Sequence, residues 1–270
     1  MDLGHRDRVV VITGASGGIG RELVATFAAE GARVVVHCHS QREAAEKIAA
    51  GLGDQAMVVP ADLSNEADVE NLFTTVESRW GGVHTLVANA GVWPPESIPI
   101  HEMKLSQWEE TISTDLTSVF LSMRRFFRGI IQYEIPDPCG ILIGSTAAVF
   151  GEAGHVDYSA AKAGLTYGMT ATLKNEISKI SPRGRVNTIC PGWTITPMVE
   201  KFSGQEEAIV RAKQTVAMKK FATPADIASA AAFLSSPVRA GHITGERMVV
   251  SGGMEGRVLN ESEACSATLP

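Results

Sequence analysis

The sequence predicts an α/β protein whose core is a doubly wound parallel sheet of about seven strands, with helices on both faces. Short runs of β-branched residues alternate with amphipathic helical stretches along most of the chain. The first such run, at 8–12, passes through a glycine-rich turn at 13–20 directly into a helical stretch. No linker, internal repeat or break in composition divides the 270 residues, so we expect one domain over 1–270.

The expected strands share a run of apolar, mostly β-branched residues that ends at glycine, proline or a polar residue. They lie at 8–12, 32–38, 56–64, 84–91, 141–146, 184–193 and 246–253. The expected helices share an amphipathic pattern. They lie at 21–30, 42–52, 66–80, 106–131, 157–178 and from 224 onward, with one further helix inside 194–222. Thr223, Pro224 and Asp226 form a typical helix start, with a cap, a first-turn proline and a first-turn acid.

The turn at 13–20 is predicted to bind the phosphates of a dinucleotide. Glycine lets the backbone approach a ligand closely, and the helix that follows presents unpaired N–H groups and the positive end of its dipole to a phosphate. The strand–turn–helix order is that of a Rossmann fold. The predicted contacts are Gly14, Ser16, Gly17, Gly18, Ile19 and Gly20. An ordinary glycine-rich turn is the alternative interpretation.

The end of the second strand bears on the choice of coenzyme. An Asp or Glu there would bind the ribose 2′-hydroxyl and repel a 2′-phosphate. The chain instead has His39, Ser40 and Arg42, with no carboxylate before Glu43. Ser40 can donate a hydrogen bond and Arg42 can pair with a phosphate, so NADP(H) is favoured and NAD(H) is the alternative. Arg42 is otherwise a surface residue at the start of a helix.

Two further strand ends are expected to contact the coenzyme. Asp62, followed by Leu63, could accept a hydrogen bond from the adenine amino group, or it could cap the helix that begins near Ser64. The small residues at 89–91 suit a backbone that passes beneath a cofactor.

Tyr158 and Lys162 lie four residues apart on a predicted helix and therefore project from the same face. An ammonium held close to a phenol favours the phenolate, which brings its pKa toward the working range of an acid–base catalyst. Ser145 lies at the carboxyl end of the fifth strand, where the reacting groups of open α/β sheets gather. A helix that carries a tyrosine and a lysine by chance is the alternative interpretation.

Composition excludes several classes of partner. The net charge is −6 and no long basic block is present, so nucleic acid is not expected. The short cluster of Arg124, Arg125 and Arg128 is expected on a solvated helix face or a subunit contact. No apolar run is long enough to span a membrane and the first residues do not resemble a signal peptide, so we expect a cytoplasmic protein without a membrane partner. The four scattered cysteines are expected to be free thiols, without a disulfide or zinc site.

Over residues 6–254 the chain strongly resembles the short-chain dehydrogenase/reductase family in its compact, single-domain form. The motifs that carry the resemblance occur in the family's order: TGASGGIG at 13–20, DL at 62–63, NAG at 89–91, Ser145, Tyr158 with Lys162, and PG at 191–192 with Thr196. The resemblance implies a Rossmann fold and an NAD(P)(H)-dependent oxidoreductase that interconverts a ketone and a secondary alcohol.

The resemblance also implies the role of each matching residue. Tyr158 would be the general acid or base, Lys162 would lower its pKa and hold the nicotinamide ribose, and Ser145 would orient the substrate oxygen. The remaining coenzyme contacts would be Asn89, Ala90, Gly91, Pro191, Gly192, Thr194 and Thr196.

The chain departs from the family pattern at a residue that belongs to the catalytic group. Asp115 stands where the family usually has an asparagine that holds a water for proton delivery. An aspartate can accept a hydrogen bond from Lys162 or water but cannot donate one. Gly17 stands where many NADP-preferring members have Arg or Lys, and Ser251 stands where an aspartate is common.

The substrate is expected to be a small carbonyl compound or alcohol, in a pocket walled by Trp93, the stretch 147–156 and Trp193 under a lid at 193–222. His155 is expected to face solvent rather than the substrate, and the polar tail at 255–270 is expected to fray. The family resemblance suggests a homo-oligomer, a tetramer or dimer, that associates through the helices at 106–131 and 157–178.

Two other functions fit a dinucleotide-binding fold. A non-catalytic coenzyme sensor or scaffold predicts loss of the Tyr, Lys or Ser, and all three are present. A sugar-nucleotide epimerase or dehydratase predicts a larger carboxyl-terminal substrate region, and the chain does not have the residues for one after the last expected strand.

Overall fold

The computed structural model describes residues 2–196 and 206–265. In this part of the chain the core is one seven-stranded sheet of order β3-β2-β1-β4-β5-β6-β7, and every neighbouring pair is parallel. The strands are β1 Val9–Ile12, β2 Arg33–Cys38, β3 Ala56–Pro60, β4 Thr85–Ala88, β5 Cys139–Ile143, β6 Arg185–Pro191 and β7 Arg247–Val250. The predicted doubly wound parallel sheet is therefore confirmed.

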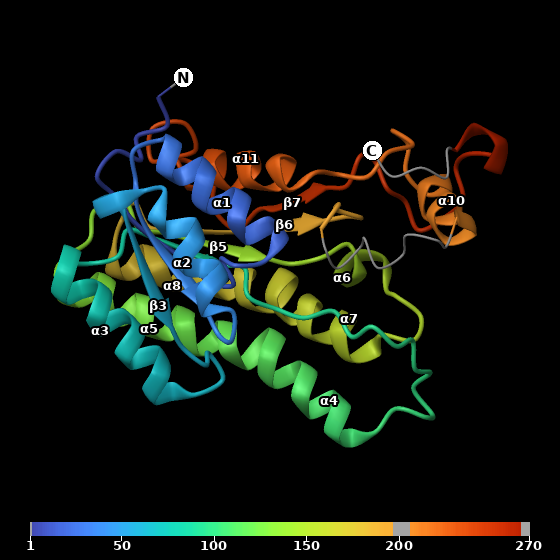
Figure 1. Cartoon of the computed structure of the whole chain (residues 1–270), viewed down its shortest axis with the longest axis horizontal. Helices are drawn as coiled ribbons and strands as arrows, with labels where there is room; N and C mark the ends of the chain where they lie inside the picture. The colour runs from blue at the N-terminus through green and yellow to red at the C-terminus, as the bar shows by residue number, and fades with distance from the viewer. Residues whose placement is uncertain (1, 197–205, 266–270) are drawn as a thin grey trace.

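Helices cover both faces of the sheet (Figure 1). They are α1 Gly18–Ala29, α2 Arg42–Ala50, α3 Glu66–Trp80, α4 Leu105–Ile112, α5 Ser118–Tyr133, α6 Ala147–Phe150, α7 Val156–Ala163, α8 Thr170–Ile180, α10 Glu206–Gln214 and α11 Pro224–Ser235. Apolar residues of α1 and α11 pack on one face and those of α3, α5 and α8 on the other, which gives two separate core clusters. The strands β1, β4, β5 and β6 are buried throughout, and β2 is buried after its first residue. The two edge strands are more open: β3 has half-buried residues and ends at the exposed Pro60, and exposed and half-buried residues alternate along β7.

The strand order reverses next to β1, whose neighbours are β2 and β4. Connections that leave β1 and β4 in opposite directions open a crevice at the carboxyl ends of these strands, where ligands of such sheets bind. The glycine-rich turn follows β1, and residues 89–91 follow β4. The topology thus brings two of the predicted coenzyme segments together.

Two helices that the sequence predicts as continuous each contain a π-helical turn. The first is at Ser113–Thr117 between α4 and α5, and the second is at Gly164–Met169 between α7 and α8. The turns meet, because a Cβ on Gly164 would lie 3.1 Å from Leu116 Cδ1. A π-turn widens the helix by one residue and rotates the side chains that follow it. Tyr158 and Asp115 therefore lie on helices whose register changes beside the site.

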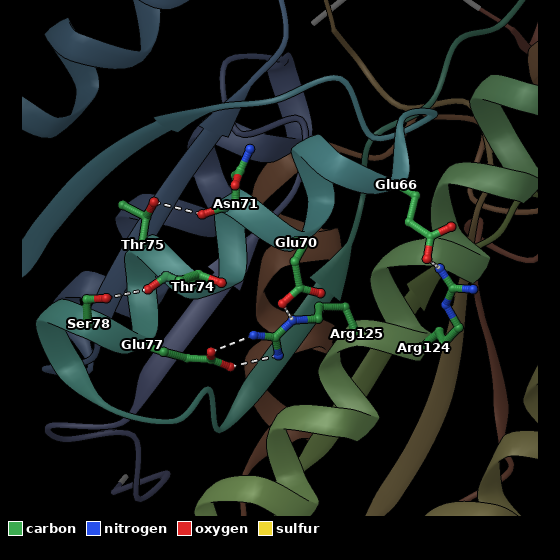
Figure 2. A network of polar contacts seen from close by, with 9 residues as sticks. All are labelled: Glu66, Glu70, Asn71, Thr74, Thr75, Glu77, Ser78, Arg124 and Arg125. Carbon is green, nitrogen blue, oxygen red and sulfur yellow. Dashed lines mark hydrogen bonds and ion pairs between the residues drawn. The ribbon is translucent and has the colours of Figure 1, made fainter.

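A buried ion network fixes α3 to α5 (Figure 2). Arg125 donates to Glu77 Oε2 at 2.6 Å and to Glu70 Oε1 at 2.8 Å. Arg125 is 6% exposed and Glu77 is 8% exposed, so the expectation of a solvated helix face or subunit contact is wrong for Arg125. Arg124 pairs with Glu66 closer to the surface. Separation of α3 from α5 would leave these buried charges without partners, which is costly, so the network keeps the two helices together.

The carboxyl-terminal part differs from expectation in two places. The fifth strand ends at Ile143, so Ser145 lies in the loop after it rather than within it. Part of the tail that is expected to fray is hydrogen-bonded to the end of α10: the N–H groups of Leu259 and Asn260 both donate to Gln214 O, at 2.8 and 3.1 Å. Of the predicted lid at 193–222, α10 and its flanks are seen, while 197–205 lie outside the described residues, as do 266–270 of the tail.

Candidate active site

A cavity of about 540 Å³ opens at the carboxyl ends of the central strands. Its lining includes the glycine-rich turn, the segment at 89–91, Ser145, Tyr158 and Lys162, and the segment after β6. The size is that of a typical small-molecule or cofactor site. Most of the residues predicted for coenzyme, catalysis and substrate therefore meet in one place.

The glycine-rich turn has no room for side chains at two positions. Gly14 has a φ of +62°, and a Cβ there would lie 2.8 Å from Ala90 Cα. A Cβ on Gly20 would lie 2.2 Å from Gly14 O. The backbone of this turn can thus approach a ligand closely. Helix α1 begins within the turn, at Gly18, and its first residues line the cavity.

The segment after β4 braces this turn. Asn89 Nδ2 donates to Thr13 O at 2.9 Å and to Gly14 O at 3.2 Å. Thr13 Oγ1 accepts from the backbone N–H groups of Asn89 and Ala90, both at 2.9 Å. Asn89 therefore shapes the dinucleotide turn as well as lining the cavity.

A histidine that the sequence reasoning did not select supports the same turn. His37, at the end of β2, accepts from Gly14 N–H through Nδ1 at 3.0 Å, and its Nε2 lies 3.0 Å from Ala61 O. Because Nδ1 accepts, Nε2 must carry the proton and donate to Ala61. Burial lowers the pKa of His37 to about 4, so the ring is neutral at pH 7. The residues next to His37 in the sequence do not indicate this role, because its partners Gly14 and Ala61 lie on other segments.

The predicted adenosine contacts are placed less favourably. His39, Ser40, Arg42, Asp62 and Leu63 are not among the residues that line the cavity, whereas Gln41 and Arg21 are. These two were missed because neither belongs to a motif.

The side-chain contacts of this region explain the difference. Arg42 pairs with Glu46, one turn further along its own helix, at 2.7 Å. Leu63 is 7% exposed and packs in the core, because the chain turns inward after β3. Asp62 accepts from Ser64 N–H at 2.9 Å, and these bonds lower its pKa. The cap of α3 is Asn65, which accepts from Ala67 and Asp68, so Asp62 does not cap that helix.

Tyr158 and Lys162 face the cavity from one side of α7, as predicted. Lys162 Nζ lies 5.6 Å from the centre of the Tyr158 ring and 3.3 Å from Ile143 O, to which it donates. Ser145 lines the same cavity. Burial raises the pKa of Tyr158, and the charge of Lys162 and the hydrogen bond from Ser145 only partly oppose that rise. A phenol, an ammonium and a hydroxyl thus converge on one space.

Asp115 is part of this group. Its Oδ2 lies 3.3 Å from Lys162 Nζ and its Oδ1 accepts from Val92 N–H at 2.8 Å. Burial raises the pKa of Asp115, and the Lys162 ammonium works against that rise. Burial alone would lower the pKa of Lys162, but Asp115 and Tyr158 outweigh it, so this pKa is raised and the ammonium is favoured. Asp115 and Lys162 thus form an ion pair at the position where the family usually has an asparagine.

The segment after β6 closes the far side. Its residues that line the cavity are Pro191, Gly192, Trp193, Thr194 and Thr196. Gly192 N–H donates to Val250 O at 3.0 Å and Thr194 Oγ1 donates to Gly192 O at 3.0 Å, so the backbone here is fixed. The Trp193 ring packs against Phe221, with centroids 6.0 Å apart.

Trp93 forms the opposite wall. It stacks on His155 with ring centroids 4.8 Å apart and donates from Nε1 to Glu152 Oε1 at 3.2 Å. His155 is 3% exposed, so the expectation that it faces solvent is wrong: the loop at 151–155 folds under the Trp93 loop. Glu152, within the stretch 147–156 that is expected to wall the substrate pocket, lines the cavity.

Within 2–196 and 206–265, no group of His, Cys, Asp and Glu side chains is arranged to hold a metal ion, and none of the helices has the length and apolar character to cross a bilayer. The cysteines Cys38, Cys139, Cys190 and Cys265 are buried and free.

Comparison with known proteins gives consistent matches. The family model described as enoyl-(acyl carrier protein) reductase matches residues 14–255. A 3-oxoacyl-[acyl-carrier-protein] reductase FabG of Vibrio cholerae serotype O1 is 34% identical over 248 residues, which cover 92% of this chain and 97% of that protein. The protein of the same name from Salmonella typhimurium is 34% identical over 250 residues, with the same coverage of 92% and 97%.

Proposed function

This chain belongs to the short-chain dehydrogenase/reductase family, and from that premise we propose that it reduces a ketone to a secondary alcohol with NADP(H), with Tyr158 as the general acid. Membership of the family makes it an NAD(P)-dependent oxidoreductase that acts on a carbonyl or CH–OH group. The observation that carries the proposal is the convergence of Ser145, Tyr158 and Lys162 on the cavity that also contains the glycine-rich turn.

The coenzyme would lie along the cavity from the glycine-rich turn to the segment after β6. The residues fit such a group: the turn leaves no space for a Cβ at Gly14 or Gly20, and the N-terminus of α1 faces the cavity. Gly91 has the same character, since a Cβ there would lie 2.9 Å from Lys162 Nζ. The nicotinamide ring of the bound coenzyme supplies the hydride.

The protein's own residues would handle the proton. In the reducing direction the Tyr158 hydroxyl gives its proton to the substrate oxygen, while the Ser145 hydroxyl holds that oxygen in place. The nearby Lys162 ammonium favours the phenolate that this transfer leaves behind, and Asp115 keeps Lys162 charged and directed toward the site. In the oxidising direction the same phenolate accepts the proton of the alcohol.

The preference for NADP(H) is supported by the absence of a carboxylate from His37 to Arg42 at the end of β2. Arg42 and its partner Glu46 are both exposed, so a phosphate could replace the glutamate as the partner of Arg42. Arg21, unlike Arg42, places a guanidinium in the lining of the cavity itself. Titration of the protein with NADPH and with NADH, followed by fluorescence, tests this point; tighter binding of NADH would contradict it.

The substrate class is proposed from the relatives. Two of them are named as reductases of 3-oxoacyl groups carried by acyl carrier protein, and the family model is described as an enoyl reductase. The tyrosine–lysine pair four residues apart beside Ser145 favours the carbonyl over the carbon–carbon double bond, because it supplies a proton to an oxygen. Oxidation of NADPH with acetoacetyl and crotonyl thioesters decides between them: turnover of the acetoacetyl ester alone supports ketone reduction, and turnover of crotonyl alone refutes it.

A non-catalytic coenzyme sensor makes a different prediction in the same assay. It binds NADPH but turns over no ketone, alcohol or enoyl compound. A sugar-nucleotide epimerase or dehydratase would act on a nucleotide sugar without net consumption of coenzyme.

We further propose that the protein is a cytoplasmic homo-oligomer that associates through α5 and α8. The two helices flank a groove of about 460 Å³, and Phe120 and Ile131 on α5 are 49% and 61% exposed. Large exposed apolar side chains of this kind commonly mark an interface. Light scattering measures the mass of the assembly in solution and so its oligomeric state. An Ile131→Glu variant whose assembly has the same mass as that of the wild-type protein would contradict an interface through α5 and α8.

A further inference from the structure

The cavity has a single carboxylate among its described lining residues, and that carboxylate is Glu152. It lies in the loop between α6 and α7, half-buried, on the side formed by Trp93. The positive side chains of the lining, Arg21 and Lys162, belong to the coenzyme turn and the catalytic group. The negative charge therefore stands at the part of the cavity that the coenzyme and the reacting groups leave to the substrate.

The position of Glu152 is fixed by its surroundings. Its Oε1 accepts from Trp93 Nε1 at 3.2 Å, and its carbonyl oxygen accepts from His155 N–H at 3.1 Å. The loop that carries it is held by the Trp93 loop through the bond from Ile98 N–H to Gly154 O at 2.9 Å. Two loops far apart in the sequence thus hold this carboxylate at the cavity wall.

Among the residues that the structure describes, one side chain, that of Trp93, donates to this carboxylate, and a carboxylate can accept several hydrogen bonds. Burial raises the pKa of Glu152, while His155 and the hydrogen bond from Trp93 act against that rise. A ligand group that donates a hydrogen bond, or carries a positive charge, would supply a further partner. A ligand carboxylate or phosphate at the same place would meet repulsion in a partly desolvated setting.

We propose that Glu152 is a specificity-determining residue that selects ketones carrying a hydrogen-bond donor, an ammonium or a hydroxyl group, beside Trp93, and that rejects ketones carrying an anion there. The proposal rests on the proposed ketone reductase function, because it assigns the substrate to the same cavity. Tyr158 and Ser145 would hold the reacting oxygen, while Glu152 would hold the far end of the molecule.

The test uses Glu152→Gln. The amide oxygen can still accept from Trp93 Nε1, so the variant removes the charge and keeps the wall. Glu96→Gln is the matched control, because Glu96 is an exposed residue of the Trp93 loop that does not line the cavity. The substrates are aliphatic methyl ketones of several chain lengths that end in an ammonium, a hydroxyl, a methyl or a carboxylate group, each assayed with NADPH for kcat/KM.

The wild-type protein and the Glu96→Gln variant are expected to prefer the ammonium and hydroxyl ketones to the carboxylate ketone. In Glu152→Gln the ratio of kcat/KM for ammonium over carboxylate should fall by about tenfold or more, which corresponds to about 1.4 kcal/mol or more. An unchanged ratio at every chain length, or an equal loss of kcat/KM for all four end groups, would overturn the proposal. A preference for the hydroxyl without one for the ammonium would restrict Glu152 to hydrogen bonding and refute selection of charge.

Failure of the proposed function gives a different result. If the wild-type protein reduces none of the ketones, the reductase proposal fails, and the role of Glu152 is then decided by equilibrium binding of the same compounds, followed through tryptophan fluorescence. Tighter binding of the ammonium compound that disappears in Glu152→Gln and persists in Glu96→Gln supports the role. Equal affinity for all end groups refutes it.

Discussion

The carboxylate of Asp115 and the ammonium of Lys162 form a buried ion pair, with Oδ2 and Nζ 3.3 Å apart and side chains 0% and 5% exposed. The pair stands beside Tyr158, so the charge of Asp115 acts on the phenol as well as on the amine. An asparagine at this position would keep the acceptor for Val92 N–H but would not carry the charge.

Asp115→Asn is therefore expected to change the pH dependence of the reaction. Asp115 raises the pKa of both Lys162 and Tyr158, so its neutralisation should lower the pKa of Tyr158. The limb of the pH–rate profile that reports Tyr158 should move to lower pH for reduction and for oxidation alike. The variant leaves unchanged the other charged groups that act on Asp115 or Tyr158, which are Asp157, Glu152 and Lys162. A profile identical to wild type would show that Asp115 is uncharged in the working enzyme.

Tyr158→Phe should lower kcat by about two or more orders of magnitude, because the proposed acid–base group is lost. Coenzyme affinity should change little, since the glycine-rich turn is intact. Tyr167→Phe is the matched control: Tyr167 lies on the helical stretch that follows but is 42% exposed. A near-full reductase rate in Tyr158→Phe would remove that residue from its proposed role.

Lys162→Met should reduce both turnover and the affinity for coenzyme, because the ammonium is proposed to support the phenolate and to hold the ribose. It also leaves Asp115 buried without its partner, and the loss of one member of a buried pair costs on the order of 3–5 kcal/mol of stability. Coenzyme titration and denaturant unfolding measure the two effects separately. Unchanged binding of coenzyme would contradict the ribose contact.

Gly20→Ala should weaken coenzyme binding by at least about tenfold and lower stability, because its Cβ would lie 2.2 Å from Gly14 O. Gly51→Ala is a suitable control, since Gly51 ends α2 with a φ of −73° and a Cβ there meets nothing within 4 Å. A Gly20→Ala protein with normal affinity would mean that the turn tolerates a displaced backbone.

The protein should lose stability in mild acid through His37. Burial lowers the pKa of His37 from 6.5 to about 4, so the unfolded state binds its proton first as the pH falls. The free energy of unfolding should be unaffected by this residue above about pH 6.5 and should decline from there to about pH 4, by on the order of 3 kcal/mol. Denaturant unfolding of wild type and His37→Asn across this range measures the effect. His84, whose pKa is also lowered to about 4 by burial, contributes in the same direction in both proteins.

Local patterns were sufficient to predict the sheet, most of the helices, and the meeting of Ser145, Tyr158 and Lys162 at one cavity. The central parallel strands are buried on both faces and therefore have continuous apolar sequences, as β1 does. Tyr158 and Lys162 could be predicted to face one way because four residues make about one helical turn. The π-helical turns could not be predicted, because they arise where α4–α5 meets α7–α8 and have no composition of their own.

The errors concern residues whose partners lie on other segments. Nothing near His155 in the sequence indicates that Trp93 would cover it, and His37 receives its role from Gly14 and Ala61. The partner of Arg42 is local, because Glu46 lies four residues later on the same helix. The sequence alone therefore allowed an ion pair with Glu46 to be considered as an alternative to a contact with the coenzyme phosphate.

The return of the chain onto α10 has a practical consequence for engineering. Gln214 O accepts from the N–H groups of Leu259 and Asn260, and Asn260 Nδ2 donates to Val216 O at 3.0 Å. The segment 259–260 therefore restrains the carboxyl end of α10. Met254, immediately upstream, lines the cavity. A protein truncated after Met254 would lose these hydrogen bonds to the end of α10 but would keep every residue that lines the cavity. Its activity would therefore report the effect of a less restrained α10 without a change in the lining residues.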